Sequence, residues 1–152
     1  MQATALMMGW VAATIAQGGI RTPLTLSTGK APVSKRVLRP ATARLVGRFM
    51  EAVVNVGTGG AAKIGGVRVA GKTGTAELKT TATPDCTPTP EAPCPPVLAD
   101  DPTDTSAWFA AYAPAAKPRI AVGVVLIANG AGGDTAAPVA RQVLSAGLKA
   151  TR

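Results

Sequence analysis

One stretch of the chain, residues 67–77, changes character halfway along, and this change constrains the fold more than any other feature. Valines alternate at its start, as in a strand with one buried face, and the polar letters Gly-Lys-Thr-Gly-Thr follow at 71–75. Such a strand offers an ammonium, two hydroxyls and unobstructed backbone N–H groups, a combination that suits a carboxylate. Because Lys72 and Thr73 leave opposite faces of a strand, one ligand can use both only along the strand's edge, where an extended peptide could add as a further strand.

Residues 66–73 also match the nucleotide-binding signature G-x-x-x-x-G-K-[ST] letter for letter. A phosphate-binding loop needs small flexible residues inside it and a helix after it. Here the inner letters are Val-Arg-Val-Ala, mostly good strand formers, and the β-branched and Pro-rich sequence after Thr73 disfavours a helix. The apolar run 120–128 is followed by Asn129 rather than by an aspartate that could bind magnesium. Nucleotide binding is therefore the weaker hypothesis, which magnesium-dependent ATP binding would revive.

Helical and strand periodicities divide the rest of the chain. They predict helices at residues 3–17, 41–54 and 136–149, strands at 67–77, 106–113 and 120–128, and a short strand within 33–38. In the first helix Leu6, Trp10 and Ala13 share a face that we expect in the core, and Asp134 or Thr135 is expected to cap the last helix. The expected fold is α+β, an antiparallel sheet with packed helices, in one unit spanning residues 1–152.

The segment 78–105 differs from its surroundings. Seven of its 28 residues are prolines, so it cannot lie inside a sheet, and we expect an exposed insertion between two strands. The net charge of +8 is uneven, because residues 80–110 carry five acidic and no basic side chains. This pattern indicates a solvated basic surface with an acidic loop. An anionic cell wall or membrane surface would also tolerate the charge.

Several classes of function are disfavoured by composition. No basic helix carries interleaved aromatic residues, which argues against a nucleic-acid partner. The chain has two cysteines and no histidine, so neither a metal site nor a cofactor is expected. The longest mainly apolar run, 5–16, is too short to span a membrane, and no basic residue precedes it as in a signal peptide. If the protein is exported, we expect its export signal outside this chain.

The Lys-Thr-Gly triplet at 72–74 and several other segments of the chain together resemble one protein family. Residues 71–77, Gly-Lys-Thr-Gly-Thr-Ala-Glu, resemble the long form of this motif in high-molecular-weight penicillin-binding proteins, which are peptidoglycan D,D-transpeptidases. Other segments resemble that family in the same order: the helix ends at 12–19 and 53–59, the strands at 107–114 and 120–127, and the helix start at 136–140. The resemblance covers nearly the whole chain. It implies the C-terminal part of a penicillin-binding/β-lactamase-like transpeptidase domain.

The resemblance implies acyl transfer from the D-Ala-D-Ala stem peptides of peptidoglycan, and binding of β-lactams at the same site. By this implication Lys72 places positive charge near the substrate carboxylate, and Thr73 and Thr75 donate hydroxyl hydrogen bonds to it across Gly74. The backbone N–H of Thr75 serves as one oxyanion donor. An extracytoplasmic location is implied as well, with membrane attachment through an upstream segment. In an exported protein, Cys86 and Cys94 are expected to form a disulfide within the insertion.

The family's nucleophile is missing from the pattern. None of the four serines, Ser27, Ser34, Ser106 and Ser145, begins a Ser-x-Asn triplet. Ser27 and Lys30 spell Ser-x-x-Lys, but Gly29 and Pro32 disfavour the helix that would place both side chains on one face. The pair also lies too close to Lys72 in sequence. We therefore expect the serine in an upstream half of the domain, and an inactive chain when alone; the alternative is a non-catalytic relative that binds peptides or cell-wall fragments.

Overall fold

A computed structural model describes residues 3–25, 29, 33–78, 89 and 104–151 of the chain. The Ser27/Lys30 pair lies outside the described residues, as do Cys86 and Cys94 and most of the predicted insertion. In the described part, no helix combines the length and the apolar character needed to cross a membrane.

The described part is built around an antiparallel sheet of three strands in the order β3-β4-β5. The strands are β3 (Ala70–Glu77), β4 (Thr105–Ala113) and β5 (Ile120–Leu126). Strand β3 pairs with β4 along its whole length, from Ala70 opposite Tyr112 to Glu77 opposite Thr105. Its other edge has no strand partner among the described residues. Together with the helices on its faces, this sheet confirms the expected α+β fold.

Strand β3 begins three residues later than the valine pattern predicted. Val67 instead bridges to Ile64 across a tight turn in which Gly66 has a φ of 71°. The carbonyl of Arg68 accepts a hydrogen bond from the N–H of Ala115, beyond the end of β4. Residues 67 and 68 therefore lie beyond the end of β4, the strand with which they would have paired. Their valine alternation reflects burial against the core, where Val69 is 2% exposed, rather than membership of the sheet.

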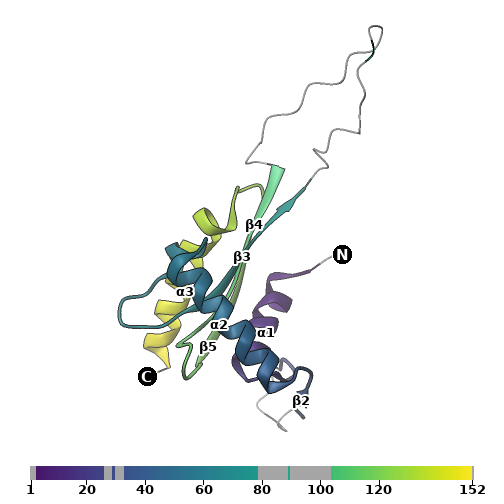
Figure 1. Cartoon of the computed structure of the whole chain (residues 1–152), viewed down its shortest axis with the longest axis vertical. Coiled ribbons are helices and arrows are strands. Elements are labelled where there is room, and N and C mark those ends of the chain that lie inside the picture. The colour runs from purple at the N-terminus through teal and green to yellow at the C-terminus, as the bar shows by residue number, and fades with distance from the viewer. Residues whose placement is uncertain (1–2, 26–28, 30–32, 79–88, 90–103, 152) are drawn as a thin grey trace.

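Helices cover both faces of the sheet. Figure 1 shows α1 on one side and α3 on the other, with α2 crossing the sheet near β3. Phe109 and Leu144 lie in the core on the α3 side, and Met50 and Tyr112 lie in the core on the α1 and α2 side. The helices are α1 (Ala5–Ala16), α2 (Pro40–Val56) and α3 (Ala137–Ala150), and a small two-stranded sheet pairs β1 (Ile20–Arg21) with β2 (Lys35–Arg36).

Helix α1 approaches β5 closely through small residues. A Cβ atom on Gly9 would lie 3.0 Å from the backbone nitrogen of Gly123, and one on Gly123 would collide with the carbonyl oxygen of Ala5. This contact turns the small side of the helix toward the sheet and leaves Leu6 68% exposed. The prediction that Leu6 packs in the core was wrong for this reason.

The approach to α3 also differs from expectation. A π-helical turn, η3 (Gly132–Ala136), leads directly into the helix. Within it the Thr135 hydroxyl donates to the carbonyl of Asn129 at 2.8 Å, so it holds the preceding turn. No side chain caps the first turn of α3, and the expected capping role of Asp134 or Thr135 was therefore wrong.

Candidate active site

The side chain of Lys72 bends around the unpaired edge of β3. Its Nζ donates to the carbonyl oxygen of Thr73 at 2.7 Å and to the Thr73 hydroxyl at 3.3 Å. Side chains at consecutive strand positions leave opposite faces, so these two groups can approach each other only at an edge. The ammonium and the threonine hydroxyl therefore meet where no neighbouring strand occupies the backbone.

The backbone groups of β3 divide between its two edges. In an antiparallel strand the N–H and C=O of one residue point the same way, and the direction alternates along the chain. The Thr73 carbonyl binds Lys72 at the unpaired edge, so by alternation the N–H and C=O of Thr75 face that edge too. Gly74, opposite Trp108, faces β4. An extended ligand along this edge would meet the backbone of Thr73 and Thr75.

The turn after α2 contributes a residue that sequence reasoning assigned only to a helix end. The Oγ1 atoms of Thr58 and Thr73 lie 2.9 Å apart, within hydrogen-bond distance. The Thr73 hydroxyl is thus placed between the ammonium of Lys72 and the hydroxyl of Thr58. A sequence signal did exist, since Thr58 is the one polar residue in a glycine-rich turn, but nothing in the sequence pairs it with a residue 15 positions later.

A mainly apolar groove of about 200 Å³ lies beside Lys72, between the start of α1 and strands β3 and β4. Met8 and Trp108 contribute its larger apolar side chains, and Lys72, Thr73 and Gly74 border it. Lys72 is thus exposed on a strand, next to an open and mainly apolar groove.

On the face of β3 that lies away from the groove, glycines allow neighbouring segments to pack closely against the strand. A Cβ on Gly132 would collide with the carbonyl oxygens of Trp108 and Gly74, and one on Gly133 would collide with the carbonyl of Thr58. The ring of Phe109 lies over Gly71, with ring carbons 2.6 Å from the position that a Cβ would take there. Residues of η3 and β4 thus support the strand directly behind Thr73.

The structure brings three of the four predicted binding residues, Lys72, Thr73 and Gly74, to one groove. Thr75 is exposed on the same strand but does not line that groove. No described serine borders it either, and Ser106 is 4% exposed in β4. The described residues contain no cluster of three or more candidate metal ligands.

The nucleotide hypothesis finds no support in the local backbone. Residues 66–73 end inside strand β3, which continues to Glu77, so the lysine is not followed by the helix that a phosphate-binding loop needs. The local structure is instead the edge of an extended strand, with an ammonium and hydroxyls beside it, and these groups pair well with a carboxylate.

Comparison with known proteins identifies the family. The family model of the penicillin-binding protein transpeptidase domain matches residues 1–145. The chain belongs to the transpeptidase-domain family of penicillin-binding proteins. The expected membership of this family is thereby confirmed.

Two mycobacterial relatives illustrate the similarity in sequence. Peptidoglycan D,D-transpeptidase PbpA of Mycobacterium tuberculosis is 34% identical over 96% of the chain, and penicillin-binding protein PbpB of Mycolicibacterium smegmatis is 30% identical over 93%. The chain spans only 29% of the length of that PbpA and 23% of that PbpB.

Solved transpeptidase structures share the fold. The transpeptidase domain of Burkholderia pseudomallei penicillin-binding protein 3 matches 95% of this chain with a TM-score of 0.73 at 28% identity. The imipenem acyl-enzyme complex of penicillin-binding protein A from M. tuberculosis matches 96% with a TM-score of 0.66 at 31% identity. The chain covers 41% and 31% of those two structures.

Proposed function

We propose that this chain forms one wall of a peptidoglycan D,D-transpeptidase site, which binds D-Ala-D-Ala stem peptides and β-lactams along the unpaired edge of β3. The observation that carries the proposal is the position of the Lys72 ammonium, 2.7 Å from the Thr73 carbonyl at that edge and beside an apolar groove. A terminal carboxylate is the natural partner of an ammonium and hydroxyls arranged in this way. Membership of the transpeptidase family supports the same assignment.

Each residue of the edge has a distinct proposed role. Lys72 supplies positive charge near the substrate carboxylate, and charged hydrogen bonds of this kind contribute roughly 1.5–3 kcal/mol. Thr73 and Thr75 donate hydroxyl hydrogen bonds to the carboxylate, while Gly74 leaves room for the ligand's backbone. The N–H of Thr75, which faces the unpaired edge by alternation, donates to the developing oxyanion. One such donor is typically worth about 2.7–4 kcal/mol in the transition state.

The nucleophilic serine is proposed to come from an upstream half of the transpeptidase domain. Two observations support this: the described serines do not border the groove, and the chain spans less than half of each transpeptidase structure compared. The upstream half would dock against this chain and complete the site. No cofactor or metal is proposed for the reaction, because acyl transfer to a serine needs none.

The setting of the protein is also proposed. We place the chain outside the cytoplasm, held at the cell membrane by an upstream segment, where stem peptides and β-lactams are accessible. Residues 78–105 would form an insertion in the domain, closed by a Cys86–Cys94 disulfide in that oxidising environment.

A non-catalytic relative is the competing proposal. The lack of a credible Ser-x-x-Lys and of any Ser-x-Asn in this sequence favours it, since the edge of β3 could hold a peptide or cell-wall fragment without acyl transfer. Binding alone requires Lys72, Thr73 and the groove; catalysis requires a serine as well.

Covalent labelling by a fluorescent penicillin tests the proposal. The 152-residue chain alone should remain unlabelled, because it lacks the nucleophile. A hybrid domain, in which this chain replaces the matching segment of M. tuberculosis PbpA, should be labelled. Lys72→Ala should slow labelling of the hybrid roughly ten- to a hundredfold, whereas Lys149→Ala, on α3, should not change it.

The remaining outcomes separate the alternatives. Equal labelling of the Lys72→Ala and Lys149→Ala hybrids would refute the role of the β3 edge. A hybrid that shows a cooperative thermal transition and retains muropeptides, but stays unlabelled, would favour the binding-only relative. Labelling of the isolated chain would contradict the proposed upstream serine and make Ser27 the first candidate nucleophile.

A further inference from the structure

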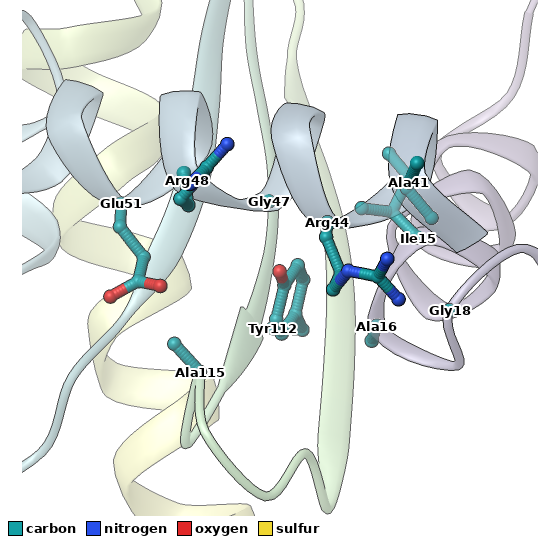
Figure 2. Close-up of a pocket in the computed structure, with 11 residues that line it drawn as sticks. Ile15, Ala16, Gly18, Ala41, Arg44, Gly47, Arg48, Glu51, Tyr112 and Ala115 are labelled. Carbon is teal, nitrogen blue, oxygen red and sulfur yellow. The ribbon is translucent and has the colours of Figure 1, made fainter.

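A second, larger cavity of about 410 Å³ lies on the α1 and α2 side of the sheet. It is bounded by the C-terminal end of α1, the first three turns of α2 and the end of β4 (Figure 2). It shares no lining residue with the groove beside Lys72. Its volume falls within the range of about 300–1,000 Å³ that is typical of small-molecule sites in proteins.

Tyr112 forms the floor of this cavity, and its hydroxyl has no partner in the described part of the protein. The residue is only 4% exposed, and its hydroxyl points toward α2 at Gly47. A Cβ on Gly47 would lie 2.7 Å from that oxygen, so only glycine lets the hydroxyl come this close to the helix. Burial, and next the charge of Glu51, raise the pKa of Tyr112. The tyrosine therefore stays protonated at neutral pH and presents a hydrogen-bond donor to the cavity.

Two arginines give the cavity an uncompensated positive charge. Arg44 and Arg48 are one turn apart on α2, and neither forms an ion pair or hydrogen bond among the described residues. Figure 2 shows Arg44 on one side of the Tyr112 ring and Glu51 on the other. Glu51 is already bound by Arg68, whose two nitrogens contact its Oε2 at 2.9 and 2.6 Å.

The chemistry of these groups selects one class of ligand. Apart from Oε1 of Glu51, whose carboxylate is held through Oε2 by Arg68, the unpartnered polar side-chain groups of the cavity are donors: two guanidinium groups and a neutral hydroxyl. Ile15, Ala16 and Ala115 provide an aliphatic wall next to them. We propose that the cavity binds a small organic oxyanion, a carboxylate or a phosphate monoester with a short aliphatic part, through Arg44, Arg48 and the Tyr112 hydroxyl. This site is separate from the proposed transpeptidase edge and does not depend on it.

The only tyrosine of the chain provides a specific reporter. Incorporation of ¹³C-labelled tyrosine gives one residue's ring signals in the NMR spectrum, all from Tyr112. The 152-residue chain would be titrated with butyrate and with propyl phosphate, which present the two acid groups on aliphatic chains of similar size. Butanol at equal concentration, and sodium chloride at equal ionic strength, are the controls for apolar binding and for screening.

We expect a saturable shift of the Tyr112 signal with at least one of the two acids, and none with butanol or chloride. Arg44→Gln should weaken the apparent affinity roughly ten- to a hundredfold, because it removes a charged hydrogen-bond partner. Arg141→Gln, on α3 at the opposite face of the sheet, should leave the affinity unchanged. By calorimetry, Tyr112→Phe should weaken binding while keeping the fold, since it removes only the hydroxyl.

A saturable shift of the Tyr112 signal with only one of the two acids would identify the ligand class as carboxylate or as phosphate. Two results would overturn the proposal: shifts that do not saturate with either acid, or equal affinities for the wild-type chain and the Arg44→Gln variant. A saturable shift caused by butanol as well would show an apolar pocket and would also contradict the oxyanion assignment.

Discussion

Replacing Phe109 with alanine tests whether β3 depends on the core behind it. Phe109 is 1% exposed, and its ring contacts the places where Cβ atoms would sit on Gly71 and Gly59, at 2.6 and 3.2 Å. Neither glycine can refill the space, so the cavity left by truncation should persist. Loss of a buried phenylalanine typically costs about 3–5 kcal/mol of unfolding free energy. For a chain of this size that corresponds to a fall in melting temperature of roughly 6–20 °C.

The chain supplies its own control, because it contains only one other phenylalanine. Phe49 lies on α2 and is 62% exposed, so Phe49→Ala should cost less than about 1 kcal/mol. Both variants would be unfolded in urea while far-ultraviolet circular dichroism is followed. Losses of stability that agree within about 1 kcal/mol would refute the assignment of Phe109 as the support of the strand.

Two further predictions concern charge. Arg68→Ala should lower the unfolding free energy by about 0.2–1 kcal/mol, and high salt should reduce the difference, because the Arg68 side chain of the Arg68–Glu51 pair is 68% exposed. An equal effect of Arg141→Ala in urea unfolding would contradict this. The raised pKa of Tyr112 means that the folded state holds this proton more tightly than the unfolded state does. Its contribution to stability is thus complete below the ordinary value of 10.0 and is lost as pH rises above it. Urea midpoints at about pH 9 and pH 10.5 should therefore fall less in Tyr112→Phe than in the wild-type chain, and equal falls would count against this role.

Periodicity predicted the central elements well because their two faces meet different surroundings. Strand β4 was expected at 106–113, and the structure places it at Thr105–Ala113. The alternation was easy to recognise because Phe109 and Trp108 point to opposite sides of the sheet. Helix α2 was expected at 41–54 and begins one residue earlier, at Pro40, because proline suits a first helical position. Alternation alone indicated that Lys72 and Thr73 can meet only at a strand edge, whereas the absence of a described strand partner at that edge came from the structure.

Contacts between segments that are far apart in the sequence could not be predicted from periodicity. Helix α1 is apolar around its circumference, so its sequence could not indicate that the Gly9 side faces β5 and that Leu6 faces outward. The Thr58–Thr73 contact joins a turn to a strand, and neither residue type requires the other. The cavity over Tyr112 forms where three elements meet, and no local periodicity encodes that meeting.

The central claim is that the unpaired edge of β3 holds a terminal carboxylate beside Lys72. The most direct measurement follows backbone amide NMR signals of the 152-residue chain during titration with an N-blocked peptide ending in D-Ala-D-Ala. We predict saturable shifts at Thr73 and Thr75, lost in Lys72→Ala and kept in Lys149→Ala. Saturable shifts confined to other surfaces, or unchanged binding by Lys72→Ala, would contradict the claim.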